Sequence, residues 1–388
     1  AQVLHEPVGR NTGPAVLAAA LHLATQDPEA LMLVVPADHV INGDLNSTIR
    51  AMAPAAAAGR IITFGITPRY AESGFGYITD GGPVAAFPGL REVAQFVEKP
   101  PVPQAKALVE GGNAYWASGI SLFAAGTIIE EYRRYDPETV AAVEQALIGS
   151  VDGAFGKVLE AECFSRATSA PTEAMVFEKS PHIALAPLSV EWSDVGSWTA
   201  MYGISPTNAQ GNVLQGDVIA VDTQNSLVRS EGRLVTVVGM SDVIVVDTPD
   251  AVLVTRMGAD QSVKTVAEAL KADNRPEVEA HTTTSHAWGN FEQLIHKSCF
   301  NLSSLTIKAG SVLEIDPATA REAIVVEGNL TVSNAHMQMD VLEGQRVALE
   351  SNVPTKLMNR SNDAVEVVFL TLDPTGTARP DSSIAHYA

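Results

Sequence analysis

Four separated segments place charged or amide side chains at the end of an apolar run. They are residues 6–12, 36–39, 97–100 and 192–198. In a parallel α/β sheet the carboxyl ends of the strands open onto one cleft, so we expect these segments to meet there. Two acids, two lysines and a segment able to read a base are the groups needed to join a sugar phosphate to a nucleotide. Such chemistry depends on positioning and on the neutralisation of charge.

Asp38 and Asp194 are the candidate carboxylates of a metal site. Asp38 follows an apolar run, and Asp194 precedes Val195-Gly196, where glycine lets the backbone come close to a ligand. Mg²⁺ prefers one or two carboxylates together with phosphate oxygens and water. The structural alternative is that Asp38 caps a turn and that Asp194 forms an Asx-turn.

The composition is that of a globular protein of 388 residues, of which 46% are hydrophobic and 18% charged. A chain of this length can hold two or three domains. The formal net charge of −20 argues against a nucleic-acid surface, because phosphate backbones are held by clustered Lys and Arg. A nucleotide can still bind, since a few local cations and backbone N–H groups suffice.

The two cysteines, Cys163 and Cys299, lack the spacing of a disulfide framework or a metal knuckle. No apolar run reaches the roughly 18 residues of a membrane span. No basic stretch followed by an apolar segment opens the chain. We therefore expect a cytoplasmic protein that has neither a membrane nor a nucleic acid as a partner.

Apolar runs alternate with helical patterns over the first 200 residues. A helix is expected over residues 15–24, with Thr12 as its cap. Residues 31–35 are a continuous apolar run, typical of a strand buried on both faces. Further strands are expected at 61–66 and 93–97, and further helices at 48–58, 103–110, 126–135 and 137–148. This alternation predicts an α/β fold with a mostly parallel, doubly wound sheet.

After about residue 205 the pattern changes to short β-branched runs separated by Gly, Asp or Asn. These runs cover residues 213–221, 227–228, 234–238, 243–246 and 251–254, and a helix is expected at 263–270. From residue 286 to about 372 short strands recur, with turns at Gly310, Gly328 and Gly344, as in a β-sandwich or barrel. The predicted domains are 1–205, a β-rich linker element at 206–272, and a β domain at 273–388.

A doubly wound nucleotide-binding domain normally begins with a strand and a glycine-rich turn that cradles phosphates. The nearest glycine pairs here, Gly111-Gly112 and Gly74-Phe75-Gly76, do not open a helix after a strand. We therefore expect the chain to be an N-terminal truncation whose sheet has an open slot lined by apolar side chains. Unpaired edges and exposed apolar surface are costly. Such a fragment should be poorly catalytic and prone to aggregate.

The four segments together resemble bacterial mannose-1-phosphate guanylyltransferases, the enzymes that make GDP-mannose, and the resemblance covers nearly the whole chain. It implies a Rossmann-like nucleotidyltransferase domain, with GTP and mannose 1-phosphate as substrates and pyrophosphate as the second product. It also implies Mg²⁺ as the cofactor, held by Asp38 and Asp194. The chain could act as a homodimer.

The resemblance assigns the first segment to the nucleotide. Glu6, Asn11 and Thr12 correspond to the family's segment at the purine, where a carboxylate can accept from the ring N–H and the exocyclic amine of guanine together. Arg10 is either a phosphate contact or a structural ion-pair partner. Taken alone, this segment could simply be a loop that ends in a helix cap.

Two acid–lysine pairs and a glycine loop correspond to the sugar side of the family's site. Glu98 matches the acid that meets sugar hydroxyls, and Lys99 the lysine that meets the sugar phosphate; a surface ion pair is the alternative. Glu178 and Lys179 resemble a second such pair, with Lys179 as a phosphate ligand. The matching glycine loop is 72–77, which includes Gly76 and Tyr77.

One position departs from the family's pattern. Ala117 lies between Trp116 and Ser118, where the family usually has an asparagine that faces the sugar. Alanine cannot donate or accept a hydrogen bond through its side chain. This chain could therefore differ from the family in its affinity for mannose or in the sugar that it uses.

Residues 286–292 resemble the start of the cupin-type isomerase domain that is often fused to this transferase. In the fused enzymes that domain holds a metal with Gln, two His and Glu. Here only Glu322 remains as an oxygen ligand, and His281, His286, His296 and His336 lack a spacing that would rebuild the site. We expect a cupin-like domain without isomerase activity, retained for packing, oligomerisation or regulation.

Three other functions compete with the leading interpretation. The chain could be a non-catalytic sugar-nucleotide sensor or regulatory subunit, because the phosphate loop and the sugar-facing asparagine are missing. It could be a nucleotidyltransferase of the same fold that uses a different base or sugar. A zinc-type phosphomannose isomerase is disfavoured by the loss of ligands.

Overall fold

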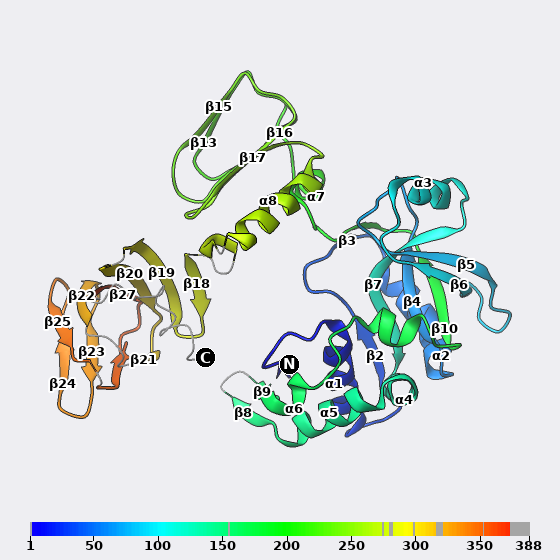
Figure 1. The fold of residues 1–388 in the computed structure, drawn as a ribbon, viewed down its shortest axis with the longest axis horizontal. Helices are drawn as coiled ribbons and strands as arrows, with labels where there is room; N and C mark the ends of the chain where they lie inside the picture. The colour runs from blue at the N-terminus through cyan, green and yellow to red at the C-terminus, as the bar shows by residue number, and fades with distance from the viewer. Residues whose placement is uncertain are drawn as a thin grey trace. The chain divides into compact units, whose positions relative to one another are not determined.

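A computed structural model describes residues 2–153, 156–273, 275–278, 282–297, 299–315, 321–351 and 353–372. The chain divides into two compact units, Ala1–Ile204 and Ser205–Ala388. The first unit mixes helices and strands, whereas the second consists mostly of strands (Figure 1). No helix within the described residues is long and apolar enough to cross a membrane.

The first unit is built on a six-stranded sheet. Its strand order is β2 (Leu31–Val34), β7 (Ala114–Ala124), β4 (Ile61–Ile66), β10 (Ile183–Leu188), β6 (Arg91–Val97) and β5 (Tyr77–Pro83). The pair β4–β10 is parallel, and the other pairs of this sheet are antiparallel. The predicted α/β class is confirmed, but the expectation of mostly parallel pairing was wrong. Apolar periodicity reports burial and not strand direction, and β7 runs back between β2 and β4.

Helices cover both faces of this sheet. One core joins the sheet to α1 (Thr12–Ala24), α4 (Ala125–Tyr135) and α5 (Pro137–Ile148). The other joins it to α2 (Leu45–Ala57) and α3 (Val102–Glu110). Successive strand residues point to opposite faces, and in β4 Ile61 enters the first core while Ile62, Phe64 and Ile66 enter the second. The result is a three-layer α/β/α arrangement.

Two local expectations in this unit need correction. The cap of α1 is Asn11, whose side chain accepts a hydrogen bond from the Thr12 N–H at 2.9 Å, and Thr12 is the first helical residue. Strand β2 is not buried on both faces, because Leu31 is 40% and Leu33 is 38% exposed. The cause is position: among the described residues β2 pairs with β7 alone and forms an edge of the sheet.

Short elements complete the first unit. Strands β1 (Leu4–His5), β8 (Val151–Gly153) and β9 (Gly156–Val158) form a small sheet, and β3 (Val40–Asn42) pairs with β11 (Glu191–Ser193). The remaining helices are α6 (Ala161–Ser165), the π-helix η1 (Glu173–Phe177) and α7 (Trp198–Ile204). The strand pair β3–β11 bears directly on the candidate site described below.

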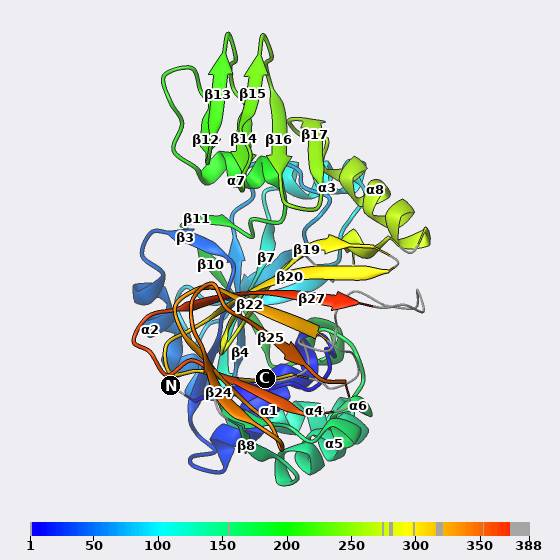
Figure 2. The ribbon, with the colours of Figure 1, turned by 90° about the vertical axis from the view of Figure 1, so that its left-hand side faces the viewer.

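The second unit begins with a parallel β-helix. Strands β12 (Val213–Gln215), β14 (Leu227–Ser230) and β16 (Val243–Asp247) stack in parallel, and so do β13 (Val218–Val221) and β15 (Val235–Val238). Figure 2 shows these strands side by side. Strand β17 (Val252–Arg256) pairs antiparallel with β16, and helix α8 (Asp260–Ala272) follows. The predicted strands and helix are all present.

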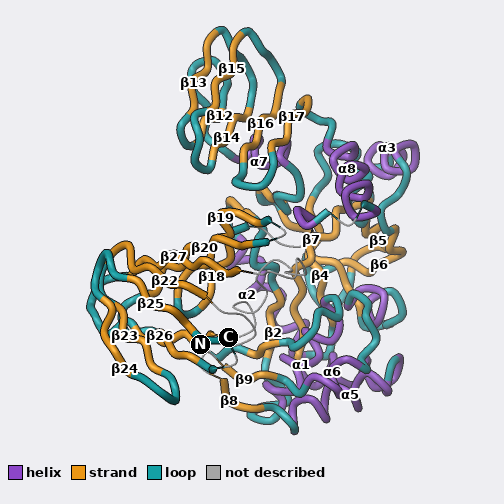
Figure 3. The backbone as a smooth tube through the Cα atoms, turned by 60° about the vertical axis from the view of Figure 1, so that its left-hand side comes forward, coloured by secondary structure: helices purple, strands orange, loops and turns teal. Residues whose placement is uncertain are grey.

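The rest of the second unit is an antiparallel β-barrel of two sheets (Figure 3). The first sheet has the order β18 (Thr283–His286), β19 (Gly289–His296), β20 (Phe300–Ile307), β27 (Val365–Leu372), β22 (Arg321–Glu327), β25 (Arg346–Leu349). The second has the order β21 (Val312–Ile315), β26 (Thr355–Met358), β23 (Leu330–Ser333), β24 (Gln338–Val341). The predicted turn glycines Gly310, Gly328 and Gly344 all have positive φ. The expected sandwich or barrel is therefore confirmed.

Candidate active site

The strand pair β3–β11 brings the two candidate metal ligands together. The antiparallel ladder pairs Asn42 with Glu191, Ile41 with Trp192, and ends at Val40 and Ser193. Asp38 and Asp194 lie two residues and one residue beyond this same end. The two segments are about 150 residues apart in the sequence, but their backbones run side by side, and each carries one of the acids.

The turn at Asp194 explains why glycine follows it. The Gly196 N–H donates to Oδ1 of Asp194 at 3.1 Å, and the Val195 N–H donates to Oγ of Ser193 at 3.1 Å. A Cβ on Gly196 would lie 2.8 Å from Oδ2 of Asp194, so a larger residue at this position would displace the carboxylate. The Asx-turn considered from the sequence is present, and it occupies one carboxylate oxygen.

His39 and Trp192 join the segment of Asp38 to the segment of Asp194. The indole N–H of Trp192 donates to Nδ1 of His39 at 3.2 Å, and the two rings meet edge to face at 5.3 Å. Because Nδ1 accepts, the proton of neutral His39 is on Nε2, which lies 3.9 Å from Oδ1 of Asp38. The Asp38 side chain is 83% exposed and thus open to a ligand.

Asp38 and Asp194 could together supply two carboxylate ligands to a hard divalent cation, with the other coordination positions taken by substrate oxygens and water. Asp38 is exposed, and Asp194 uses one oxygen for its own turn. Within the described residues no group of three or more His, Cys, Asp or Glu converges as a metal site. Two carboxylates plus phosphate oxygens is the donor set that Mg²⁺ favours, whereas a structural zinc site would need four protein ligands.

Aromatic rings form a wall next to the acids. Phe75 contacts both Trp116 and Trp192 edge to face, with ring centroids 5.2 Å apart in each pair. Tyr70 packs on Trp116 at 4.9 Å and remains 56% exposed. Burial and the nearby charges of Glu72 and Asp194 raise the pKa of Tyr70. The phenol of Tyr70 therefore lies near Asp194, one of the two candidate metal ligands.

The glycine loop meets the first acid–lysine pair. A Cβ on Gly76 would lie 2.9 Å from Oε2 of Glu98 and 3.6 Å from Cβ of Ala117, so these three residues border one spot. Tyr77 is 1% exposed, and its hydroxyl exchanges hydrogen bonds with the backbone of Glu72. The side chain of Tyr77 thus shapes the loop and offers no surface to a sugar.

Lys99 is held in an unusual conformation. Its ammonium lies 2.9 Å from Oε1 of Glu98, and both side chains are about two-thirds exposed. Its φ of 41° is in the left-handed region, which costs a non-glycine residue free energy. In the described part of the first unit, the non-glycine residues with positive φ are Asn11, Lys99 and Val195, and each lies in one of the four segments.

The second acid–lysine pair follows the π-helix η1, and a carboxylate of that helix links the two pairs. Burial raises the pKa of Glu173, and the neighbouring charges of Glu98 and Glu178 raise it further. Lys179 is exposed, and its backbone carbonyl accepts from the hydroxyl of Tyr135 at 2.8 Å. The acids of both pairs, Glu98 and Glu178, therefore lie near enough to Glu173 for their charges to act on its carboxyl.

The nucleotide segment is anchored at the start of α1. Oγ1 of Thr12 accepts from the Thr172 N–H at 3.2 Å, which ties the helix start to the segment before η1. Partial burial raises the pKa of Glu6. A guanidinium nitrogen of Arg10 donates to the carbonyl of Ser165 in α6. Of the two roles considered for Arg10, this contact favours the structural one.

In the second unit, the structure changes the assignment of the surviving acid. Glu322 is 44% exposed and lies 3.7 Å from Arg346 on the outer face of the barrel. The residue that points inward at that place is Arg321, which is 3% exposed. Glu322 is therefore no inward oxygen ligand, because neighbouring strand residues face opposite sides. His281 and the side chain of His296 lie outside what the structure describes.

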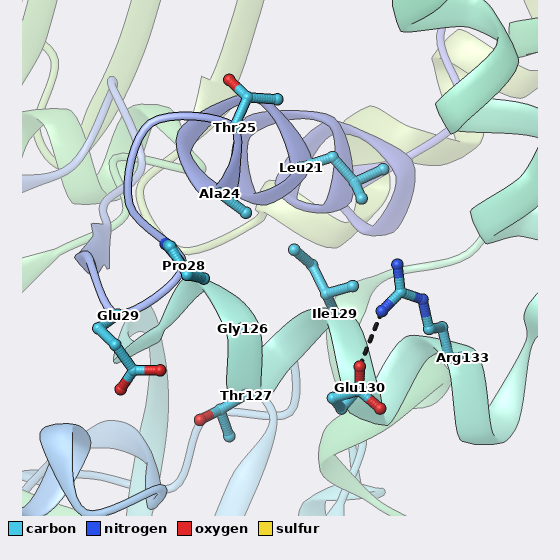
Figure 4. Close-up of a pocket in the computed structure, with 10 residues that line it drawn as sticks. All are labelled: Leu21, Ala24, Thr25, Pro28, Glu29, Gly126, Thr127, Ile129, Glu130 and Arg133. Atoms are coloured by element: carbon cyan, nitrogen blue, oxygen red, sulfur yellow. Dashed lines mark hydrogen bonds and ion pairs between the residues drawn. The ribbon is translucent and has the colours of Figure 1, made fainter.

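A hollow of about 460 Å³ lies elsewhere in the first unit, between the end of α1 and the start of α4 (Figure 4). Its lining includes Glu29, Thr127 and the ion pair between Glu130 and Arg133 at 2.7 Å. No residue of the four segments lines it. The hollow is therefore separate from the candidate site.

Two functional candidates, Tyr70 and Glu173, could not be found from the sequence. Tyr70 precedes the glycine loop by two residues, and Glu173 precedes Glu178 by five. Neither belongs to a spacing pattern that indicates chemistry. Only the fold relates them to the site: Tyr70 packs on Trp116, the charge of Asp194 acts on Tyr70, and the charge of Glu98 acts on Glu173.

The chain is similar to known proteins over most of its length. Residues 1–211 match the Nucleotidyl transferase family, and residues 216–270 match the MannoseP isomerase/GMP-like beta-helix domain. A mannose-1-phosphate guanylyltransferase of Escherichia coli (strain K12) is 39% identical over 85% of this chain and 71% of its own length. The alginate biosynthesis protein AlgA of Pseudomonas syringae pv. tomato is 32% identical over 94% of this chain and 77% of its own.

A solved structure is similar as well. It is described as mannose-1-phosphate geranyltransferase from Thermus thermophilus, and it shares 28% identity with a TM-score of 0.58. The match covers 68% of this chain and 76% of that one.

Proposed function

The chain belongs to the mannose-1-phosphate guanylyltransferase family, and we propose that it transfers GMP from GTP to mannose 1-phosphate, giving GDP-mannose and pyrophosphate. The observation that supports this most is the meeting of Asp38 and Asp194 at one end of the β3–β11 ladder. The transfer is assigned to residues 1–205. Residues 206–272 and 273–388 are proposed as a β-helix linker and a cupin-like domain without isomerase activity.

The reaction is a substitution at phosphorus. A phosphate oxygen of mannose 1-phosphate forms a bond to the α-phosphorus of GTP, and the bond from that phosphorus to the oxygen bridging to the β-phosphate breaks. The β- and γ-phosphates leave as pyrophosphate. The protein's task is to hold two anions in line and to offset their repulsion.

The cationic side chains act on the phosphates. Lys99 and Lys179, exposed beside Glu98 and Glu178, hold the sugar phosphate and the reacting phosphate. Glu98 and Glu178 accept hydrogen bonds from sugar hydroxyls, and Gly76 leaves room for the ring to approach Glu98. Glu6, with Asn11 and Thr12, reads the guanine edge.

Nucleotidyl transferases of this family generally use a divalent metal ion. We assign Mg²⁺ here, with Asp38 and Asp194 as its protein ligands, and it would neutralise charge on the triphosphate. The Gly196 N–H holds the carboxylate of Asp194, and the exposed carboxylate of Asp38 lies 3.9 Å from Nε2 of His39.

The test is pyrophosphate release from GTP and mannose 1-phosphate by the full-length protein at millimolar Mg²⁺. Parallel assays with ATP, UTP and dTTP, and with glucose 1-phosphate, identify the base and the sugar. Release that requires both substrates and prefers GTP supports the proposal. Binding of both without release would favour a sensor, and preference for another base or sugar would reassign the substrate.

Every candidate residue of the site lies in the first unit. A homodimer is therefore a separate proposal. Sedimentation equilibrium at micromolar concentrations tests it directly.

A further inference from the structure

We propose that Tyr70 is a further substrate-binding residue, whose hydroxyl donates a hydrogen bond to the phosphate of mannose 1-phosphate. This inference deepens the proposed function and rests on it. Tyr70 lies in none of the four segments that the sequence singles out, since it precedes the glycine loop 72–77 by two residues. The fold, and not a motif, assigns it to the substrate.

The ring of Tyr70 is held by a cluster of aromatic side chains. It packs edge to face on Trp116, with ring centroids 4.9 Å apart, and Trp116 is 3% exposed in the core that joins the sheet to α2 and α3. Phe75 contacts both Trp116 and Trp192 at 5.2 Å. Trp192 precedes Asp194 by two residues. The four rings together therefore hold Tyr70 near the segment that carries Asp194.

The backbone that follows Tyr70 is fixed as well. The hydroxyl of Tyr77 accepts from the Glu72 N–H at 3.0 Å and donates to the Glu72 carbonyl at 2.9 Å. Oε1 of Glu72 accepts from the Gly74 N–H at 2.8 Å. Both the ring of Tyr70 and the chain next to it are thus ordered before a ligand binds. A hydrogen bond from a preorganised side chain costs little conformational entropy.

The hydroxyl of Tyr70 is left for a ligand. The residue is 56% exposed, and among the described residues its hydroxyl has no hydrogen-bond partner. Burial, followed by the charges of Glu72 and Asp194, raises the pKa of this phenol above its usual value. At neutral pH the phenol is therefore protonated and offers an O–H donor.

The position of Tyr70 selects the sugar phosphate among the groups of the two substrates. Gly76, in the loop that follows Tyr70, borders Glu98 on the sugar side of the site. Asp194, whose charge acts on Tyr70, is one of the two proposed metal ligands. The nucleotide segment, residues 6–12, is anchored at the start of α1 instead. The phosphate of mannose 1-phosphate joins the sugar to the metal-bound phosphates, and its charged oxygens are strong acceptors.

Equilibrium binding to the full-length protein, measured by calorimetry, tests this contact without turnover. GDP-mannose carries the sugar phosphate and GTP does not, so the two ligands separate the contact from nucleotide binding. Tyr70→Phe removes the hydroxyl and keeps a ring to pack on Trp116. At millimolar Mg²⁺ we expect its Kd for GDP-mannose to rise about tenfold, with the Kd for GTP and the melting temperature unchanged. In turnover assays the KM for mannose 1-phosphate should rise and the KM for GTP should not.

Tyr132→Phe is the matched control, because it removes a hydroxyl that has a structural partner. The hydroxyl of Tyr132 is buried and donates to the carbonyl of Gly13 at 3.0 Å. This variant should melt at a lower temperature than wild type. Its ratio of the Kd for GDP-mannose to the Kd for GTP should stay at the wild-type value.

A failure of this inference differs from a failure of the proposed function. The inference is wrong if Tyr70→Phe binds GDP-mannose as tightly as wild type does, or if its Kd rises equally for GDP-mannose and GTP. Either result leaves the transferase reaction standing when wild type releases pyrophosphate from GTP and mannose 1-phosphate. A wild type that releases no pyrophosphate and does not bind GDP-mannose overturns both proposals.

Discussion

At the scale of single residues, Asp194 divides its two carboxylate oxygens between structure and chemistry. Oδ1 accepts from the Gly196 N–H and holds the turn, while Gly196 keeps the space beside Oδ2 free. A substitution can therefore separate the two tasks. Asparagine can still accept the Gly196 N–H but carries no charge for a cation.

We expect Asp194→Asn to keep wild-type thermal stability and to lower turnover by about two orders of magnitude or more. Asp194→Ala should lose the turn as well as the charge, and so should also unfold at a lower temperature. Pyrophosphate release over a range of Mg²⁺ concentrations, with melting temperatures, measures both effects. Wild-type turnover in Asp194→Asn would contradict the metal assignment.

Glu173 makes the stability of the first unit depend on pH. Burial, followed by the charges of Glu98 and Glu178, raises its pKa above the unfolded value of 4.5. A carboxyl with a raised folded pKa binds its proton more tightly in the folded state. Its cost to stability is therefore absent below pH 4.5, grows as pH rises towards the folded pKa, and stays at its full value above it.

Glu173→Gln should accordingly raise the melting temperature at pH 7 to 8 and flatten its decline above pH 4.5. Thermal melts of both proteins from pH 4.5 to 8 give the comparison. Glu130→Gln, on the exposed face of α4, serves as the charge control. Equal pH slopes for wild type and Glu173→Gln would show that this carboxyl is not perturbed.

At the scale of elements, the short strand pair β3–β11 positions Asp38 and Asp194, the two acids proposed as metal ligands. The pair is only three residues long on each side. A pair of this length is marginal without further contacts. The hydrogen bond from Trp192 to His39 and their edge-to-face packing supply those contacts.

Trp192→Phe keeps an aromatic ring beside Phe75 but removes the N–H donor. We expect a cost of about 1 kcal/mol, a melting temperature lower by about 2–4 °C, and a higher Mg²⁺ requirement. The matched control is Trp198→Phe in α7, outside the ladder. An unchanged Mg²⁺ requirement in Trp192→Phe would mean that the ladder does not position Asp38 and Asp194.

In this chain the position of a strand along the sequence is easier to predict than the strand with which it pairs. Strand β4 has its predicted bounds, because five of its six residues are apolar or glycine, the exception being Thr63, and a run of this kind is typical of a strand covered on both faces. Strands β7 and β10 were not predicted, although each is largely buried. Gly119 and Pro187 interrupt their apolar runs, and pairing with β4 overrides that local weakness.

The candidate site shows the same division. The four segments could be found by residue type, since acids and lysines next to glycine or proline mark loops at strand ends. Their mutual contacts could not, because the pairing of Val40 with Ser193 joins distant segments. The inward Arg321 was missed for another reason: a one-residue change of register moves every side chain of a strand to the opposite face.

At the scale of the whole molecule, net charge acts on substrates that are themselves anions. The formal charge is −20, and both GTP and mannose 1-phosphate are negative. Long-range repulsion then slows their approach at low salt. The Debye length falls from about 30 Å at 0.01 M to about 8 Å at 0.15 M ionic strength, which screens this repulsion.

We therefore expect the KM for GTP to fall several-fold as ionic strength rises from about 0.01 to 0.15 M at fixed free Mg²⁺. Steady-state assays in sodium chloride, with kcat recorded alongside, test this. The kcat should change little, since contacts inside the site are short. A KM that rises over this range would show that the local field of Lys99 and Lys179 dominates the approach.

The strand pairings of the two units are independent of each other. Each sheet in the described residues is closed within one continuous stretch of chain, so no strand is shared across residue 204. A mutation in one stretch then breaks no strand pairing in the other stretch. A change of sequence in the barrel can therefore leave every described strand pairing of the first unit intact.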